Sequence, residues 1–175
     1  ILTVCASALA LAFITAADVF FDNFTLRVFN LCAIYIVLAL SLNLLNGFTG
    51  IFSLGHAGFM AIGAYVSALL TMGPAQKEMN FYLAPIIRPL AGLQIPFLPA
   101  LLLAGFAAAL FAFLIGLPVL RLHDDYLAIA SLGFAEIIRV VITNLQRVTN
   151  GALGLKGLPK YSTTYVVWGC AILAI

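Results

Sequence analysis

The stretch Val28–Gln76, VFNLCAIYIVLALSLNLLNGFTGIFSLGHAGFMAIGAYVSALLTMGPAQ, contains no Asp, Glu, Lys or Arg residue and decides the fold class. A helix needs about 20 apolar residues to cross the hydrocarbon core of a bilayer, so this stretch is long enough for two crossings. The stretches Ile1–Ala17 and Pro89–Leu120 are also free of charges. Of the 175 residues, 65% are hydrophobic and only 8% are charged, against roughly 25% charged residues in soluble domains. The sequence therefore predicts an all-α, polytopic transmembrane helical bundle.

Hydrophobic segments separated by polar connections recur along the chain. We expect about six of them, at 1–17, 28–45, 51–72, 97–119, 126–143 and from 164 onward. The longer connections are then 17–27, 73–96, 121–126 and 144–162. The prolines of 73–96 exclude a continuous helix through that connection. Lys and Arg are too scarce for a basic nucleic-acid-binding surface, so no nucleic-acid partner is expected.

Polar and small residues interrupt the charge-free stretch between Asn43 and Tyr65. One interpretation is helix packing, in which small residues let two backbones approach and Asn or Ser side chains bond across helices for about 0.6–2 kcal/mol each. The other is a polar path, in which NGFTG at 46–50 unwinds a helix and the freed backbone groups line the path. Because Asn-Gly favours turns, we expect a helix broken near 46–50 and a close-packed helix after the break.

The polar residues of this stretch recur every three or four positions, so on a continuous helix they would crowd one side. The candidate residues of a substrate path are Asn43, Asn46, Gly47, Gly50, Ser53 and His56. A single histidine makes no metal site. His56 is therefore interpreted either as a hydrogen-bonded packing residue or as a direct contact for a solute or proton.

Glu136 and Arg139 form a second polar feature inside a hydrophobic segment. Counted from Asp125 at 1.5 Å per residue, Glu136 lies about 16 Å into its span, near mid-depth. An ionisable group at that depth indicates a functional role. The alternative is a structural ion pair with Arg139, one helical turn further on, while Arg139 reaches toward the nearer surface. The sequence leaves both interpretations open.

Residue patterns for enzymatic chemistry are absent from the sequence. It contains no metal-binding cluster, no nucleophile with a neighbouring base and no phosphate-binding GxxxxGK[ST] motif. We therefore expect no catalytic residue, no metal site and no cofactor bound by this chain, which we expect not to be an enzyme. Energy for any transport would come from an ion gradient or from another polypeptide.

Two separated stretches resemble the permease subunits of branched-chain amino-acid ABC importers. They are LNLLNGFTGIFSLGHAGFMAIGAY, at 42–65, and LRLHDDYLAIASLGFAEIIRVVITNLQRVTNGALGLKGLP, at 120–159. The nearer relative is the subunit of the high-affinity leucine, isoleucine and valine type that carries a GDYLAI-like segment before a Gly-rich loop. The chain departs from the family pattern at His123 and Asp124, which stand where Arg-Gly is usual, and at Ala152 and Leu153, which stand where Pro-Asn is usual.

The resemblance implies a single transmembrane permease domain, 1–175, which we expect to be truncated at both ends. The family's basic ATPase-docking loop follows the sixth span and is not in this sequence. The resemblance also implies a cytoplasmic hinge that contains Arg121, Asp124 and Asp125, with 144–162 on the periplasmic side. The count of Lys and Arg in the connections alone would favour the opposite orientation.

The partners that the resemblance implies are a second, non-identical permease subunit, two cytoplasmic ATPase subunits that use ATP, a periplasmic solute-binding protein and membrane lipid. The location it implies is the bacterial cytoplasmic (inner) membrane, crossed several times. A hydrophobic amino acid would then be accepted briefly by neutral dipoles at the path residues, since a formal charge there would trap it.

Three other functions stay open at this point. The chain would be an ion-gradient-driven secondary transporter if Glu136 or His56 carried a proton. It would be an ABC permease for urea or short amides if the solute were different. It would be a structural subunit without a path if the polar residues served packing alone.

Overall fold

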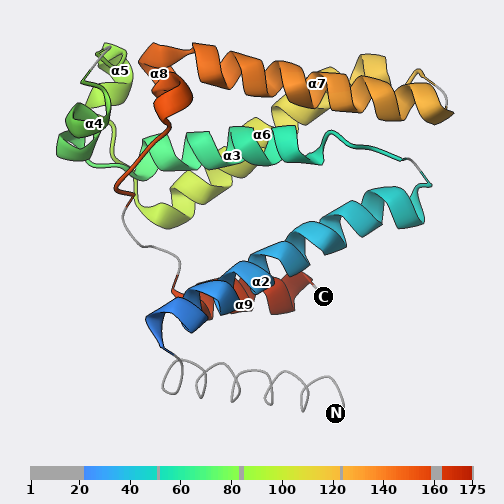
Figure 1. Cartoon of the computed structure of the whole chain (residues 1–175), viewed down its shortest axis with the longest axis horizontal. Coiled ribbons are helices and arrows are strands. Elements are labelled where there is room, and N and C mark those ends of the chain that lie inside the picture. Colours follow the sequence, from blue (N-terminus) through green and yellow to red (C-terminus); the bar gives the residue numbers. More distant parts are fainter. Residues whose placement is uncertain (1–21, 51, 83–84, 123, 159–162, 175) are drawn as a thin grey trace. The chain divides into compact units, whose positions relative to one another are not determined.

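The structure is a computed structural model that describes residues 22–50, 52–82, 85–122, 124–158 and 163–174 (Figure 1). Within these ranges the regular elements are helices and no β-strand occurs, which confirms the predicted all-α class. The chain divides into two compact units, Ile1–Gly50 with Lys160–Ile175, and Ile51–Pro159. The first predicted hydrophobic segment, 1–17, lies outside the described residues.

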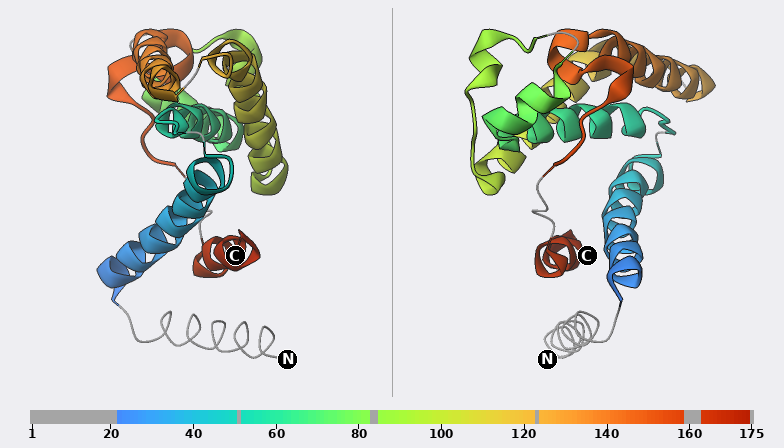
Figure 2. Two further views of the ribbon diagram at one scale, coloured as in Figure 1. Left: turned by 90° about the vertical axis from the view of Figure 1, so that its right-hand side faces the viewer. Right: turned by 60° about the vertical axis from the view of Figure 1, so that its left-hand side comes forward.

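The described part of the first unit consists of α2 (Asn23–Asn43), a π-helical turn η1 (Leu44–Phe48) that continues it, and α9 (Thr164–Ala174). α2 packs against α9 (Figure 2). The rings of Phe29 and Trp168 stack with their centroids 4.4 Å apart, and Asn30 Nδ2 donates to Thr164 Oγ1 at 3.3 Å. An aromatic pair adds about 0.5–1.5 kcal/mol to the burial of its rings, so this contact anchors α9 on α2.

The first turn of α2 includes residues that the sequence predicts as a polar connection. Asn23–Arg27 is helical, and Leu26 N donates to Asp22 O at 2.9 Å to close the turn. This stretch has no Gly or Pro to stop the helix, so the predicted connection 17–27 is wrong from Asn23 onward. With η1, the continuous helix has 26 residues, which makes it about 39 Å long at 1.5 Å per residue.

The second unit contains α3 (His56–Thr71), α4 (Pro74–Asn80), α5 (Arg88–Ala91), α6 (Phe97–Val119), α7 (Asp124–Asn144), α8 (Gln146–Thr149) and the 3-10 turn η2 (Gly151–Leu153). α3 packs against both α6 and α7, and α6 also contacts α7 (Figures 1 and 2). Ala100 and Ala104 of α6 are buried. A Cβ at Gly63 of α3 would lie 3.8 Å from Ala108 Cβ, so small residues on both helices set their close approach.

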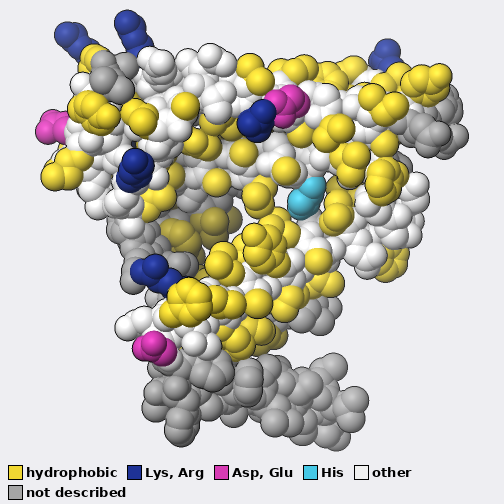
Figure 3. Space-filling view, in the orientation of Figure 1, with side chains coloured by type: hydrophobic (Ala, Val, Ile, Leu, Met, Phe, Trp, Pro, Cys, Tyr) yellow, Lys and Arg dark blue, Asp and Glu magenta, His cyan; other side chains and the backbone are white. Residues whose placement is uncertain are grey.

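Three described helices are long and apolar enough to cross a membrane: Asn23–Phe48, Phe97–Val119 and Tyr126–Asn144. Only 6%, 11% and 17% of the most apolar stretch of each helix, in that order, is buried within the structure. Hydrophobic side chains are spread over the face seen in Figure 3. Because the chain itself covers so little of this apolar surface, the surface is suited to lipid or to other membrane helices.

Two predicted boundaries shift in the second unit. The segment 51–72 becomes helical only at His56, and the segment 126–143 is already helical at Asp124. The predicted polar hinge 121–126 is therefore wrong from Asp124 onward, because an acidic first turn favours the positive end of a helix. The link 73–96 is divided between α4 and α5, as its prolines predict.

Candidate functional site

The helix that starts at Asn23 ends close to the predicted break. Asn46 is still inside the π-helical turn, and the backbone leaves the helix at Thr49. Gly50 follows with a φ of 67°, a conformation that favours glycine. Nothing lies within 4 Å of a Cβ built at Gly50, so this glycine serves the backbone rather than packing. The predicted break is confirmed: the helix ends at Thr49, and the next described helix, α3, begins at His56.

Two of the candidate path residues, Asn43 at the end of α2 and Gly47 in the π-helical turn, lie close together. A Cβ at Gly47 would lie 2.5 Å from Asn43 Oδ1, so the missing side chain leaves room for the Asn43 amide. Asn43 is exposed and Asn46 is half-buried. π-helical turns occur frequently at functional sites, and this one lies beside the exposed amide of Asn43.

The six candidate path residues fall into two groups. Those of the first unit are Asn43, Asn46, Gly47 and Gly50, and those of the second unit are Ser53 and His56. A single polar helix side is not formed, because the helix ends between the two groups. Ser53 and His56 are half-buried in the second unit.

A serine of α7 holds the segment that leads into α3. Ser131 Oγ accepts from Leu54 N at 2.9 Å and donates to Ala128 O at 2.8 Å. A Cβ at Gly55 would lie 3.2 Å from Ser131 O, and one at Gly58 would lie 3.0 Å from Ala135 Cα. The two glycines therefore allow α3 to touch the backbone of α7, which supports the packing interpretation for this part of the sequence.

A cavity of about 390 Å³ lies between α3 and α7. Residues of both helices line it: Ala57, Gly58, Ala61 and Tyr65 on α3, and Leu132, Ala135, Glu136, Arg139, Ile142 and Thr143 on α7. The walls are mainly apolar, and the two charged side chains, Glu136 and Arg139, come from α7. Sequence spacing predicts the pairing of Glu136 with Arg139, but it gives no sign that α3 faces them.

Glu136 and Arg139 form an ion pair with several contacts. Arg139 Nη2 lies 2.6 Å from Glu136 Oε1, and Arg139 Nε donates to Glu136 Oε2 at 2.9 Å. Their side chains remain 54% and 72% exposed, respectively. A guanidinium that contacts both oxygens of a carboxylate fixes the orientation of the two planes, so the pair presents one negative and one positive group side by side.

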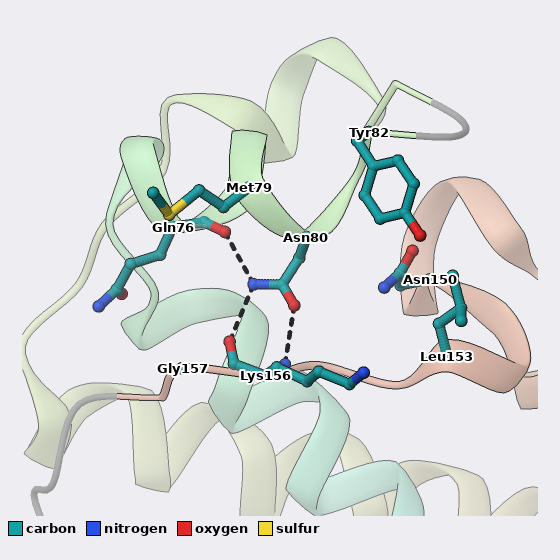
Figure 4. Close-up of a pocket in the computed structure, with 8 residues that line it drawn as sticks. All are labelled: Gln76, Met79, Asn80, Tyr82, Asn150, Leu153, Lys156 and Gly157. Carbon is teal, nitrogen blue, oxygen red and sulfur yellow. Dashed lines mark hydrogen bonds between the residues drawn. The ribbon is translucent and has the colours of Figure 1, made fainter.

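The two long connections of the second unit are joined through Asn80. Asn80 Nδ2 donates to Gln76 O at 2.8 Å and to Lys156 O at 2.9 Å, and Lys156 N donates to Asn80 Oδ1 at 2.8 Å (Figure 4). A pocket of about 370 Å³ lies beside this contact. Tyr82 and Asn150 point toward one another across it (Figure 4).

Lys77 is buried beneath the same surface, with 1% of its area exposed. Its ammonium donates to Leu90 O at 2.7 Å and also to Leu93 O, so it ties α4 to the end of α5. Burial lowers the pKa of Lys77. Sequence analysis predicted neither Lys77 nor Asn80, since a lone Lys or Asn in a connection usually faces water.

The predicted hinge residues lie after α6 and in the first turn of α7. Arg121 is exposed in the turn after α6, and Asp124 and Asp125 are the first two residues of α7. Among the residues that the structure describes, no three His, Cys, Asp or Glu side chains meet to hold a metal ion.

A family described as "Branched-chain amino acid transport system / permease component" matches residues 24–167. The chain belongs to this permease family. The match confirms the resemblance indicated by the motifs at 42–65 and 120–159. It spans the π-helical turn, the α3–α7 cavity and the Asn80 contact, so each of these features lies within the part shared with the family.

Two curated relatives are named as permease proteins of a branched-chain amino acid transport system. The high-affinity branched-chain amino acid transport system permease protein LivM of Escherichia coli (strain K12) is 41% identical over 136 residues, 78% of this chain and 28% of LivM. LivM of Salmonella typhimurium (strain LT2) is 42% identical over 127 residues, 73% of this chain and 25% of the relative. The chain thus spans less than a third of the length of these permease relatives. No solved structure matches it.

Proposed function

We propose that the chain is part of the transmembrane permease subunit of a binding-protein-dependent ABC importer for branched-chain, hydrophobic amino acids. The observation that carries this proposal is the family match over residues 24–167, together with two relatives named as permeases of a branched-chain amino acid transport system. The membrane is the bacterial cytoplasmic (inner) membrane. The three long apolar helices supply the spans that such a subunit needs.

The proposed partners follow from the same family description. A permease component of a transport system works with other subunits: here a second, non-identical permease, two cytoplasmic ATPases and a periplasmic solute-binding protein. ATP is hydrolysed on the ATPase subunits, and this chain binds no cofactor and catalyses no reaction of its own. The sequence supports this division of labour because it lacks a phosphate-binding motif.

The proposed receiving surface for the solute is the pair of connections 73–96 and 144–162. Asn80 joins α4 to the backbone at Lys156 through a side-chain amide that bonds both the N–H and the C=O of that residue. This contact makes the two connections one surface, as delivery from a single partner would require. The solute then passes residues that offer neutral amides and backbone groups, Asn43 and Asn46 among them. Rigid-body movement of helix groups would open the path alternately to each side.

The proposal is tested with the full-length protein and its partner subunits reconstituted in liposomes. Uptake of radiolabelled leucine is expected to require both the binding protein and ATP inside the liposomes. Isoleucine and valine should compete with leucine, and urea should not. Uptake that persists without ATP and collapses with the proton gradient would contradict the proposal, as would preferential uptake of urea or short amides.

A further inference from the structure

The Glu136–Arg139 ion pair lies at a depth where charge needs a partner. Along α7, Glu136 is about 18 Å from Asp124 and about 12 Å from Asn144 at 1.5 Å per residue, well inside a hydrocarbon core about 30 Å thick. Both side chains are more than half exposed in the structure. Ionisable groups at this depth face a bundle interior or a water-filled cavity rather than lipid. This side of α7 therefore faces a polar path or other protein.

The cavity beside the ion pair has apolar walls. Ala57 and Ala61 of α3 and Leu132 of α7 line it together with the two charged residues. Its volume of about 390 Å³ falls within the range of about 300–1,000 Å³ that is typical of small-molecule sites. A mainly apolar, open cavity with one negative and one positive group at its wall matches a ligand that carries both charges next to an aliphatic chain.

We propose that this cavity binds the transported amino acid as a zwitterion. Arg139 takes the α-carboxylate, Glu136 takes the α-ammonium, and the aliphatic side chain lies against Ala57, Ala61 and Leu132. The inference rests on the proposed function and deepens it, because it names Glu136 and Arg139, near mid-depth, as the residues that bind the two charged groups of the solute. The neutral dipoles of 43–53 then serve a different stretch of the path.

The hydrogen-bonding capacity of the pair suits this ligand. The bonds between the two residues use Nε and Nη2 of Arg139, and a guanidinium has five N–H donors, so Nη1 can serve a second carboxylate. A carboxylate such as that of Glu136 offers about four lone-pair positions, more than these contacts fill.

Binding and release of the solute are both favoured because the zwitterion has no net charge. The ion pair and the zwitterion are each neutral overall, so binding brings no net charge into the membrane. When the solute leaves, Glu136 and Arg139 still neutralise one another, and neither is left as an uncompensated buried charge. The solute is therefore held and released rather than trapped.

The test uses the full-length protein with its partner subunits in liposomes, supplied with saturating leucine-loaded binding protein. Glu136→Gln and Arg139→Gln are each expected to lower the maximal rate of leucine uptake by about tenfold or more, since each removes a charge-assisted hydrogen bond to the solute. ATP hydrolysis stimulated by the loaded binding protein should stay close to wild type. The matched controls Asp22→Asn and Arg27→Gln remove the same charges at the start of α2 and should leave uptake unchanged.

A charge-swapped variant, Glu136→Arg with Arg139→Glu, separates binding from structure because it keeps the ion pair. It should assemble and hydrolyse ATP yet transport leucine poorly. Exchanging the carboxylate and ammonium positions around a fixed side chain selects the mirror-image amino acid.

Wild-type uptake in the swapped variant would mark a purely structural ion pair and overturn the proposal. Wild-type uptake in both single variants would overturn it as well, and so would parallel loss of uptake and hydrolysis in all three variants. A wild-type protein that moves no branched-chain amino acid would instead contradict the proposed function.

Discussion

The two ends of α3 are attached to their unit by opposite means. At the start of the helix, Gly55 and Gly58 bring it against the backbone of α7, and one hydroxyl, on Ser131, bonds the incoming chain. Beyond its last turn, polar side chains make the attachments: Lys77 bonds the carbonyls of Leu90 and Leu93, and Asn80 bonds Lys156.

The difference reflects the two environments. Between apolar helices in lipid there is little hydrophobic driving force, so close van der Waals contact through small residues has to hold the pair together. A connection outside the spans has no helix or sheet to satisfy its N–H and C=O groups, so side chains must do it. The same chain therefore uses the absence of side chains at one end of α3 and long polar side chains past the other.

The largest effect is expected from breaking the glycine contact. Gly58→Val places a branched side chain where even a Cβ would lie 3.0 Å from Ala135 Cα, and overpacking of this kind costs about 1–3 kcal/mol. Thermal unfolding of the full-length protein in detergent measures the loss. Gly133→Val on α7 is the matched control, since nothing lies within 4 Å of a Cβ there. Equal losses in the two variants would show that the contact is unimportant.

The next largest effect is expected from Asn80→Ala, which removes a polar attachment beyond the end of α3. The change leaves the N–H and C=O of Lys156 without their protein partner and is expected to cost about 1–2 kcal/mol. Amide hydrogen exchange over 150–158 should quicken, because Asn80 bonds that backbone directly. Asn144→Ala is the control, since the Asn144 amide donates to Val140 O of its own helix. Unchanged hydrogen exchange would show that Asn80 does not hold the two connections together.

A smaller effect is expected from removing the Ser131 hydroxyl, which bonds the chain just before α3. Ser131→Ala leaves Leu54 N–H without its acceptor, and a net hydrogen bond contributes about 1 kcal/mol. The unfolding temperature should fall slightly while the packing of α3 on α7 persists. Thr143→Val, whose hydroxyl bonds Arg139 O and Val140 O of its own helix, is the comparison. A loss as large as that of Gly58→Val would mean that the serine, and not the glycines, holds the two helices.

The smallest effect is expected in the pH dependence of stability, through the buried Lys77. Burial lowers the pKa of Lys77 from its ordinary value of 10.5, so the unfolded chain keeps this proton to a higher pH than the folded protein does. Between the two pKa values the unfolded state binds more protons, and stability rises with pH in the window just below 10.5. Unfolding measured across alkaline pH should show this rise. Lys77→Met should abolish it, whereas Lys156→Met, which removes an exposed lysine, should retain it.

Features with local causes could be predicted from the sequence. The span Phe97–Val119 coincides with its predicted segment, because a proline precedes it and Arg121 follows soon after. The break near 46–50 follows from its glycines: Asn46-Gly47 stays in the π-helical turn, and Gly50 takes the positive φ just after it. The three-residue spacing of Glu136 and Arg139 places them on neighbouring positions of one helix face.

Features with distant partners could not be predicted. Asn80 and Lys156 lie 76 positions apart in the chain, and Leu54 and Ser131 lie 77 apart. No periodicity in one segment encodes such pairs, because the partner is chosen by tertiary packing. For the same reason, the cavity beside Glu136 could not be predicted. The sequence shows the two charged residues, but only the fold brings Ala57 and Ala61 to face them. The roles of the predicted path residues in transport stay predictions.

The length of the helix Asn23–Phe48 has a consequence for where those path residues act. Its charge-free part, from Val28 to Phe48, is about 32 Å long at 1.5 Å per residue, which matches a hydrocarbon core about 30 Å thick. With Arg27 at one membrane surface, Phe48 and Gly50 reach the opposite surface rather than the midplane. The amides of Asn43 and Asn46 then lie toward that surface, where backbone and side-chain polar groups meet water more readily than at mid-depth.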